Sequence, residues 1–383
     1  MSLENEITTI KSWDDLNLKN NLLRGIYSYG FENPSPIQQK AIQPIIESND
    51  VIAQSQSGTG KTGCFTVASL QKINENLKKT QVLIISPTRE LSQQIINVLN
   101  NLGTYMKDLT TQLLVGGVST DYDIEKYKNN TPQIAVGCPG RIFDMLKRNV
   151  IKTNDLKLLV LDEADEMLST GFKEQIYNIL NYLSNDIQIA LFSATIPNDL
   201  FNLTQKIMRN PVNIIVKTEM LTLEGIKQHY VNLNNDNEKY STLKDLFESF
   251  SVSQCIIYCN SVKRVQDLYD AMKGDGYPVC QIHSSLEKNE RLKNYKEFRE
   301  GNQRVLISSN VTARGIDVQQ VSTVINFDIP KSKETYLHRI GRSGRWGRKG
   351  VAINFITRRD ITLLKDIESF YSTEISELPS NFA

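Results

Sequence analysis

Residues 50–70 read DVIAQSQSGTGKTGCFTVASL, and this stretch decides the fold. DVIA is typical of a β-strand, SQSGTG of a glycine-containing turn, and KTGCFTVASL of the start of a helix. A phosphate-binding loop has this strand–loop–helix context, with the pattern glycine, four free positions and Gly-Lys-Ser/Thr. Gly60, Lys61 and Thr62 fit that pattern, but Ser55 stands where it has glycine. Serine can serve there if its φ is negative, so we predict a nucleotide-binding loop; the alternative is a simple Gly/Ser turn before a helix.

The chemistry expected of this loop follows from its residue types. Backbone N–H groups and the helix N-terminus would face phosphate oxygens, and Lys61 would reach the β- and γ-phosphates of ATP. The hydroxyl of Thr62 would bind Mg²⁺. The expected ATP-binding residues of the loop are Ser55, Gln56, Ser57, Gly58, Thr59, Gly60, Lys61 and Thr62.

Length and composition indicate a soluble chain of more than one domain. Domains usually span roughly 100–200 residues, so a chain of 383 residues predicts two or three. A formal net charge of +1 means that any nucleic-acid site must be a local groove. No apolar run approaches the roughly 18 residues of a membrane span. The start, MSLENEITTI, has no signal-peptide pattern, so we expect an intracellular protein with no membrane partner.

The cysteines and histidines argue against a zinc site or a disulfide framework. The chain has five cysteines, none in a C-x-x-C pair, and three histidines. Cys255 and Cys259 flank the apolar IIY, and we expect them to be small packed thiols of a strand.

Apolar, β-branched runs alternate with stretches of helical periodicity in two series. The first is DVIA, QVLIIS, QIAVG, LKLLVLDE and QIALFSAT, and the second is QCIIYC, RVLISS, TVINFD and VAINFI. Such runs predict parallel sheets covered by helices on both faces, with ligands beyond the carboxyl ends of the strands. KTEMLTLEGI (217–226) interrupts the pattern. We therefore expect a linker there, between a first domain, 1–216, and a second, 227–383.

Two carboxylates follow one of the predicted strands. KLLVLDEADEM places Asp162 and Glu163 at the end of an apolar run, where a parallel sheet binds its ligands. Asp162 suits a second Mg²⁺ contact, partly through water, and Glu163 could orient or deprotonate an attacking water. The alternative is an acidic helix N-terminus that complements the helix dipole. With the phosphate loop upstream, we predict the catalytic role.

These residues resemble the DEAD-box RNA helicases. Asp162-Glu163-Ala164-Asp165 spells the motif that names the family, and the other motifs follow in the family's order. The family usually has alanine at the position of Ser55, which accounts for the departure from the general loop pattern. The resemblance covers essentially the whole chain and implies an α/β fold of two tandem RecA-like domains. The further matching motifs are GFENPSPIQ (30–38), PTREL (87–91), GG (116–117), CPGR (138–141), SAT (193–195), YCNS (258–261), SNVTARGID (309–317) and HRIGRSGR (338–345).

The resemblance implies further ATP contacts. Phe31 would stack on adenine, Gln38 would read its edge, and Asp317 would bond the ribose. An amide side chain both donates and accepts, so Gln38 can match adenine N6 and N7 together. A core aromatic before a turn is the alternative for Phe31.

Two arginines of the second domain are implied to be catalytic. Arg342 and Arg345 lie three residues apart, on one face of a helical turn, and could reach the γ-phosphate as arginine fingers. The alternative is a solvated basic stretch that also holds Arg339, Arg348 and Lys349.

For RNA, the resemblance implies contacts along the sugar–phosphate backbone, with 2′-OH groups separating RNA from DNA. Ser193, Thr195 and His338 are implied to couple the motifs, and the first two could equally have a structural role. Spacing alone gives no case for the RNA residues, since lone arginines are usually solvated. They are Pro87, Arg89, Gly116, Gly117, Pro139, Gly140, Arg141, Arg291 and Arg314.

The sequence departs from the family pattern in four places. Cys138 stands where threonine is usual, Lys288 where glutamine is usual, and Ser309-Asn310 where Thr-Asp is common. These three bear on RNA affinity. Trp13 replaces an upstream phenylalanine, which is a fair exchange of aromatic residues.

Together these features predict an ATP-dependent RNA helicase with ATP and Mg²⁺ as cofactors. LLRGIYSYGF, DEADEML, GFKEQIY, LTLEGIKQ and GRKGVAINF resemble the initiation-factor-four-A subfamily, whose members include the translation-initiation helicase and a nuclear paralogue of exon junctions and ribosome assembly. RGIDVQQVS favours the former, whereas HRIGRSGR, VAINF and FYSTEISELP favour the latter. We expect a cytoplasmic monomer in translation initiation, with scaffold or regulatory protein partners. The alternatives are a nuclear ATP-gated RNA clamp or remodeller, and a DNA translocase.

Overall fold

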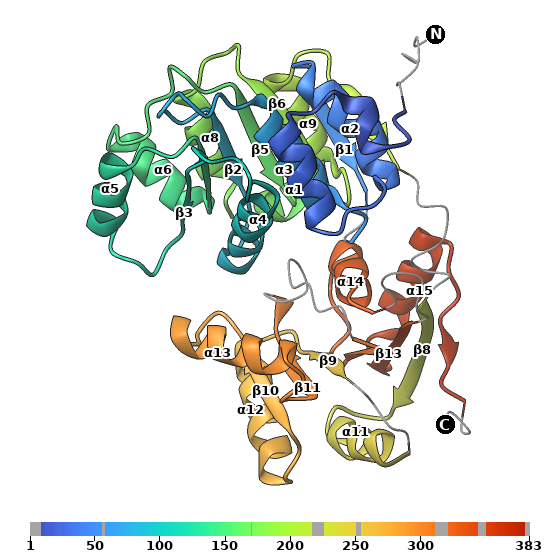
Figure 1. Cartoon of the computed structure of the whole chain (residues 1–383). Coiled ribbons are helices and arrows are strands. Elements are labelled where there is room, and N and C mark those ends of the chain that lie inside the picture. The colour runs from blue at the N-terminus through green and yellow to red at the C-terminus, as the bar shows by residue number, and fades with distance from the viewer. Residues whose placement is uncertain are drawn as a thin grey trace. The chain divides into compact units, whose positions relative to one another are not determined.

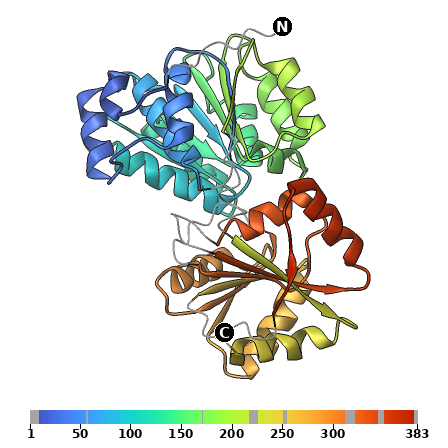
Figure 2. The same cartoon turned by 90° about the vertical axis from the view of Figure 1, so that its right-hand side faces the viewer.

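The computed structural model describes residues 9–55, 58–169, 171–216, 226–249, 254–310, 321–343 and 350–379. The chain divides into two compact units, Met1–Lys217 and Thr218–Ala383 (Figures 1 and 2). Within the described ranges, each unit contains a sheet of seven strands, and the strand pairs of both sheets are parallel. The expected α/β fold of two tandem RecA-like domains is confirmed.

The sheet of the first unit has the strand order β3-β4-β2-β5-β6-β1-β7. Its register pairs Val51 of the first strand with Ala190 of the sixth. The order places the first, fifth and sixth strands side by side, and the second, third and fourth likewise. The strands are β1 (Val51–Gln54), β2 (Val82–Ile85), β3 (Thr111–Leu114), β4 (Ile134–Gly137), β5 (Leu158–Asp162), β6 (Gln188–Ser193) and β7 (Val212–Ile215).

Helices cover both faces of this sheet because alternate residues of each apolar strand point to opposite sides. In β2, Val82 and Ile84 belong to one core cluster, whereas Leu83 and Ile85 belong to the other. The first cluster packs against α1 (Asn20–Ser28), α2 (Pro36–Ile46), α3 (Lys61–Lys72), α4 (Arg89–Leu102) and the 3-10 helix η1 (Trp13–Leu16). The second packs against α5 (Thr120–Asn129), α6 (Pro139–Lys147), α7 (Ala164–Ser169), α8 (Lys173–Asn181) and α9 (Asn198–Ile207).

The second unit repeats this plan with the strand order β10-β11-β9-β12-β13-β8-β14. The strands are β8 (Ile226–Leu233), β9 (Cys255–Tyr258), β10 (Val279–Ile282), β11 (Val305–Ser308), β12 (Thr323–Asn326), β13 (Gly350–Thr357) and β14 (Ser376–Glu377). One core cluster packs against α11 (Glu238–Ser249) and α12 (Val262–Gly274). The others pack against α13 (Lys288–Arg299), α14 (Lys333–Ile340) and α15 (Ile361–Tyr371).

Each strand predicted from an apolar run is present, with its ends shifted by a few residues at most. Five further strands, β3, β7, β8, β10 and β14, gave no comparable signal because they contain polar residues, as in TQLL and VCQI. Ile226, placed at the end of the expected linker, already begins β8, and residues 217–225 lie outside the described ranges. Cys255 and Cys259 are buried free thiols, as expected. In the described part of the chain, no helix is long and apolar enough to cross a membrane.

Candidate active site

The expected nucleotide residues of the first unit converge at one edge of its sheet. Lys61 begins the helix that follows β1, Asp162 is the last residue of β5, and Ser193 is the last residue of β6. These three parallel strands are neighbours, so their carboxyl ends lie together. The topology therefore brings the predicted loop, the carboxylates and the SAT motif to one place.

The loop residues adopt conformations that suit close approach to a ligand. Gly58 has φ of 84° and Gly60 has φ of 101°, the left-handed region that glycine tolerates best. The hydroxyls of Ser55 and Thr59 are 2.7 Å apart and hydrogen-bonded. Ser55 is not among the described non-glycine residues of positive φ, so serine fits its position. Gln56 and Ser57 lie outside the described residues.

Lys61 and Glu163 form an ion pair at the start of α3. The Nζ atom of Lys61 lies 3.3 Å from Oε1 of Glu163, and both side chains are buried. Glu163 has φ of 50°, which is uncommon for a residue with a Cβ and costs backbone energy. The strained conformation directs the chain from β5 into α7, with Glu163 facing the lysine of the loop.

Asp162 has a strongly perturbed carboxyl group. Burial raises its pKa to about 7, and the negative charge of Glu163 adds to the effect. The charge of Lys61 and the N–H of Glu163, which donates to Oδ1 of Asp162 at 3.0 Å, oppose it. A cation beside the carboxylate would favour its ionised form. Thr62 and Asp162 offer hard oxygen donors, which are the ligand type that Mg²⁺ prefers, so the residues fit that ion.

Asp165 ties the acidic motif to the SAT motif. Its Oδ2 accepts from the backbone N–H of Thr195 at 3.2 Å and from the Thr195 hydroxyl at 2.7 Å. Its own N–H donates to the Ser193 hydroxyl at 3.3 Å, and that hydroxyl donates to the carbonyl of Thr195 at 2.7 Å. The structure thus gives Ser193 and Thr195 a bracing role. Sequence reasoning named Asp165 only as part of the acidic motif and did not predict these bonds, because its partners lie at and after the end of β6.

Phe31 and Gln38 lie against the start of α3. Gln38 accepts from the N–H of Ser35 at 2.8 Å and donates to the carbonyl of Gly60 at 3.1 Å. A Cβ at Gly63 would come within 2.6 Å of Nε2 of Gln38 and 3.0 Å of Cε2 of Phe31. Gly63, which sequence reasoning missed, therefore lets both side chains approach. An amide has two hydrogens and two lone pairs, so Gln38 keeps a donor and an acceptor for a ligand.

The Phe31 ring packs against Trp13. Trp13, which is fully buried, stacks on it with ring centroids 6.2 Å apart and planes 13° apart. Phe31 itself is half-buried and packs against the first core cluster. It is therefore partly a core aromatic, with a remaining exposed surface beside the loop.

The expected RNA residues of the first unit also lie at the carboxyl edge of its sheet, after three further strands. Pro87 and Arg89 follow β2, the glycine pair follows β3, and CPGR follows β4. These strands are neighbours in the sheet. A Cβ at Gly117, which has φ of 84°, would lie 2.5 Å from Nη1 of Arg89. The Arg89 guanidinium therefore rests against the glycine pair, and Pro139 begins α6 nearby in the sheet order.

Arg141 makes internal contacts that its expected RNA role did not include. Its guanidinium forms an ion pair with Asp123 and donates to the carbonyl of Val118 at 2.7 Å. Its side chain is 9% exposed. The geometry therefore gives Arg141 the task of bracing the segment after β3. Gly140 has open space around it, and the thiol of Cys138 lies 3.7 Å from the Ser92 hydroxyl.

The second unit carries the remaining expected residues. Arg291 lies in α13 and donates to the carbonyl of Ser284 at 3.1 Å. His338 lies in α14, and Arg342 follows that helix. Arg314, Asp317 and Arg345 lie outside the described residues.

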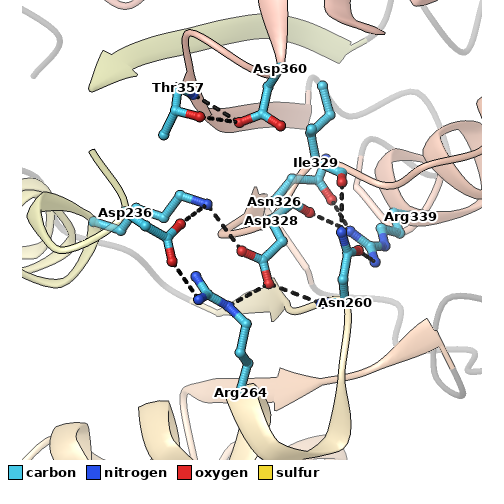
Figure 3. A network of polar contacts seen from close by, with 10 residues as sticks. Asp236, Asn260, Arg264, Asn326, Asp328, Ile329, Arg339, Thr357 and Asp360 are labelled. Carbon is cyan, nitrogen blue, oxygen red and sulfur yellow. Dashed lines mark hydrogen bonds and ion pairs between the residues drawn. The ribbon is translucent and has the colours of Figure 1, made fainter. Parts of the chain in front are cut away.

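Arg339 corrects one alternative interpretation. A solvated basic stretch would expose it, but its side chain is fully buried and bonded to oxygens of four residues. Three of them, Asn260, Asn326 and Asp328, are drawn in Figure 3. Burial lowers the pKa of this guanidinium to about 10, so it stays charged near neutral pH. Sequence reasoning missed these bonds because Arg339 and its partners come from four separate segments of the chain.

Known proteins share this arrangement of sequence and fold. The family model described as DEAD/DEAH box helicase matches residues 35–203, and the helicase conserved C-terminal domain matches residues 238–347. The chain is 54% identical over 372 residues to the ATP-dependent RNA helicase eIF4A of Candida albicans, covering 97% of this chain and 93% of the relative. It is 52% identical over 374 residues to eIF4A of Saccharomyces cerevisiae, covering 98% and 94%.

Solved structures superpose on nearly the whole of this chain. Saccharomyces cerevisiae Dbp5 bound to RNA and ADP BeF3 superposes with a TM-score of 0.90 at 36% identity, covering 97% of this chain and 96% of that one. A variant of the same protein bound to Gle1 and IP6 superposes with a TM-score of 0.80 at 35% identity, covering 98% and 96%.

Proposed function

Because the chain belongs to the DEAD/DEAH-box helicase family, we propose that it works as an ATP-dependent RNA helicase in translation initiation. Membership of this family identifies the class of enzyme as an RNA-dependent ATPase. The eIF4A relatives, at 52% and 54% identity over nearly the whole chain, support the pathway and a cytoplasmic location. They favour the translation-initiation reading of RGIDVQQVS over the nuclear one.

The observation that carries the proposal is the buried Lys61–Glu163 pair beside Asp162. Three ionisable groups from the phosphate loop and the end of β5 meet at the ligand edge of the sheet. A buried ion pair is weak evidence for stability, but perturbed groups at such an edge are typical of a reaction centre. The pair holds the lysine and the carboxylate ready for a phosphate ligand.

Binding of ATP would exchange the partners of this pair. The phosphate oxygens would accept hydrogen bonds from the loop N–H groups, and Lys61 would turn from Glu163 to the β- and γ-phosphates. Glu163 would then accept a hydrogen bond from the attacking water and orient it. Bound Mg²⁺ would neutralise phosphate charge, with Thr62 and Asp162 as its ligands. Phe31 and Gln38 would select adenine.

Arg342 and Arg345 would supply positive charge from the second unit. Charge on the γ-phosphate oxygens must be stabilised during transfer, and an arginine can add roughly 10³–10⁵ in rate. We propose that ATP and RNA draw the two units together so that these arginines reach the phosphate. Asp317 would bond the ribose.

RNA would bind along the edge formed by the residues after β2, β3 and β4, and by Arg291 and Arg314 of the second unit. Contacts to phosphates and 2′-OH groups need no base reading, which suits an enzyme that acts on many sequences. The Asp165–Thr195 bonds link the acidic motif to the segment after β6, so we infer that they carry the coupling. The Dbp5 complexes with RNA and with Gle1 support RNA and protein partners for this chain, which we propose to act as a monomer.

The test is ATP hydrolysis and unwinding of a short RNA duplex by the full chain, with matched single-stranded RNA and DNA as activators. We expect RNA to stimulate hydrolysis and DNA to fail. Equal stimulation by DNA would refute the RNA assignment. Slow turnover with RNA retained for hours, in the presence of ATP, would indicate a clamp in place of a helicase.

A further inference from the structure

A buried ion pair lies at the carboxyl edge of the first sheet, among the residues expected to bind RNA. The guanidinium of Arg141 pairs through Nη1 with Oδ2 of Asp123, and Nη2 donates to the carbonyl of Val118 at 2.7 Å. The two charged side chains are 9% and 6% exposed. Each charge is therefore neutralised mainly by the other and not by water.

The topology of the sheet explains why these two side chains meet. Asp123 lies in the first turn of α5, which follows β3, and Arg141 lies in the first turn of α6, which follows β4. β3 and β4 are parallel neighbours, and the N–H of Cys138 donates to the carbonyl of Leu114 at 3.1 Å where the two strands end. Both helices therefore begin at the same edge of the sheet, the edge at which such folds bind ligands.

Arg89, the other expected RNA arginine of the first unit, has a different environment. It begins α4, after β2, and its guanidinium rests against Gly116 and Gly117, where added Cβ atoms would lie 3.1 and 2.5 Å from its nitrogens. Within the described ranges, Arg89 forms no ion pair. It can give its full charge to a phosphate, whereas Arg141 cannot do so while its pair is intact.

The described bonds that shape the segment after β3 do not use the carboxylate of Asp123. The backbone N–H of Asp123 donates to the carbonyl of Ser119 at 3.3 Å, and its backbone carbonyl accepts from Nε2 of Gln112 at 3.0 Å. Arg141 holds the carbonyl of Val118 through its other terminal nitrogen. The segment is thus held by bonds to backbone groups, which leaves the carboxylate as a counter-charge for the arginine.

We propose that Asp123 sets the affinity of this protein for RNA, because its carboxylate competes with an RNA phosphate for the guanidinium of Arg141. Phosphate and carboxylate oxygens both match the planar fork of an arginine, so the two anions are rivals for the same donors. A phosphate that approaches the intact pair also meets the negative charge of Asp123 at close range. The proposal rests on the proposed function, since it assumes that RNA follows the residues after β2, β3 and β4.

The competition favours release of RNA after each turnover. An arginine that is fully available to a phosphate displaces counterions from the RNA, and this displacement strengthens binding and makes it depend on salt. A paired arginine contributes less of both effects. A helicase that acts repeatedly must release its strand, and a carboxylate beside the phosphate path shortens the time for which RNA stays bound. Asp123 thus favours turnover over the long retention expected of a clamp.

The test is the affinity of the full chain for a fluorescently labelled oligouridine, measured with a non-hydrolysable ATP analogue at several salt concentrations. Asp123→Asn keeps the shape of the side chain and removes its charge. We expect this variant to lower the dissociation constant about threefold to tenfold and to steepen the slope of log K against log salt by about 0.7, the value for one further phosphate contact to a single strand. RNA dissociation should slow by a similar factor.

Asp144→Asn is the matched control. Asp144 lies in the same helix, α6, and pairs with Arg148 at 2.8 Å, but this pair is more exposed and lies toward the other end of the helix. The control removes the same charge from the chain, and it should leave the dissociation constant and the salt dependence unchanged. An equal gain in affinity would show that net charge alone is responsible and would overturn the proposal. Weaker binding by Asp123→Asn, or unchanged affinity and salt dependence, would overturn it as well.

Arg141→Gln and its combination with Asp123→Asn complete a double-mutant cycle, which remains decisive if Asp123→Asn alone does not fold. Arg141→Gln leaves the carboxylate beside the phosphate path without its partner, so RNA binding should weaken. Removing the carboxylate in that background should restore the affinity to within about twofold of the wild type, because a neutral pair neither attracts nor repels phosphate. A double variant that binds RNA as weakly as Arg141→Gln would overturn the proposal.

The wild-type protein separates this proposal from the function on which it rests. If the wild type binds the oligouridine no more tightly than matched DNA, and neither stimulates hydrolysis, the RNA helicase function fails. If the wild type binds RNA and hydrolyses ATP in response but Asp123→Asn does not tighten binding, the role of Asp123 alone fails.

Discussion

Lys61 Nζ lies 3.3 Å from Oε1 of Glu163, and this pair joins the phosphate loop to the acidic end of β5. Their side chains are 5% and 6% exposed, so each charge is stabilised by the other and not by water. A phosphate group would offer the lysine a stronger partner. We therefore propose that the pair is a resting state that ATP displaces.

Lys61→Ala should abolish ATP hydrolysis and weaken ATP binding, because the loop loses its cation for the phosphates. Removing one partner of a buried pair costs up to about 3–5 kcal/mol of unfolding free energy. Denaturant unfolding and ATPase assays measure both effects.

The control for this change is Lys173→Ala. Lys173 pairs with Asp199 at the same 3.3 Å, but both side chains are exposed. A surface pair contributes about 0–1 kcal/mol, so this variant should keep its stability and its ATPase rate. Normal hydrolysis by Lys61→Ala would remove the phosphate-loop assignment.

The raised pKa of Asp162 predicts a stability that falls as pH rises. Its folded pKa of about 7 exceeds the value of 3.8 of the unfolded chain, so the folded state binds more protons between these two pH values. The nucleotide-free protein should lose stability from about pH 4 to pH 7, and Asp162→Asn should remove this slope. Thermal unfolding at several pH values measures it.

Binding of Mg²⁺ and ATP should strengthen over the same pH range, because the metal needs the ionised carboxylate. A flat pH dependence in the wild-type protein would mean that Asp162 is ionised throughout.

Gly63→Ala should raise KM for ATP. The added Cβ would press on Gln38 and Phe31, and these side chains form the expected adenine contacts. Gly274→Ala is the control, since Gly274 lies in a helix with nothing within 4 Å of its Cβ position. Steady-state kinetics with ATP and GTP measure both affinity and selectivity. An unchanged KM for ATP in Gly63→Ala would show that Gln38 and Phe31 do not contact the nucleotide.

Sequence reasoning predicted the residues that chemistry fixes by type and spacing. A lysine after a glycine-rich turn and two carboxylates after an apolar strand have few other uses, and the structure brings Lys61 and Glu163 together. The apolar strands were also predictable, because burial on both faces demands them.

Contacts between distant segments could not be predicted in this way. Asp165 in α7 bonds to Thr195, which follows β6, and Arg339 donates to oxygens of residues that are far apart in the chain. Arg141 shows the same limit, since its ion pair with Asp123 depends on how the segment after β3 folds back. From residue type alone, such arginines are predicted to be solvated. Only the fold reveals their partners.

Ser55→Ala should leave hydrolysis nearly unchanged. The Ser55 hydroxyl is hydrogen-bonded to the Thr59 hydroxyl, so its loss removes one hydrogen bond worth about 0.5–1.5 kcal/mol. A small fall in melting temperature with normal kcat is the expected result. A large loss of kcat would assign the hydroxyl a part in catalysis.

The roles of Glu163 and Arg342 should differ in their effect on RNA. Glu163→Gln should stop hydrolysis but keep ATP and RNA bound, because the amide cannot act as the base while the loop is intact. Arg342→Ala should stop hydrolysis without trapping RNA, since the cation that completes the site is absent. RNA dissociation rates in the presence of ATP distinguish the two variants.

The most direct measurement is the ATPase rate of the full chain with and without single-stranded RNA, for the wild type and for Arg342→Ala. A two-unit RNA helicase predicts strong RNA stimulation in the wild type and its collapse in Arg342→Ala, with an Arg342→Lys variant restoring little because an ammonium lacks the planar fork. A wild-type rate that ignores RNA, or full RNA-stimulated hydrolysis by Arg342→Ala, would contradict it.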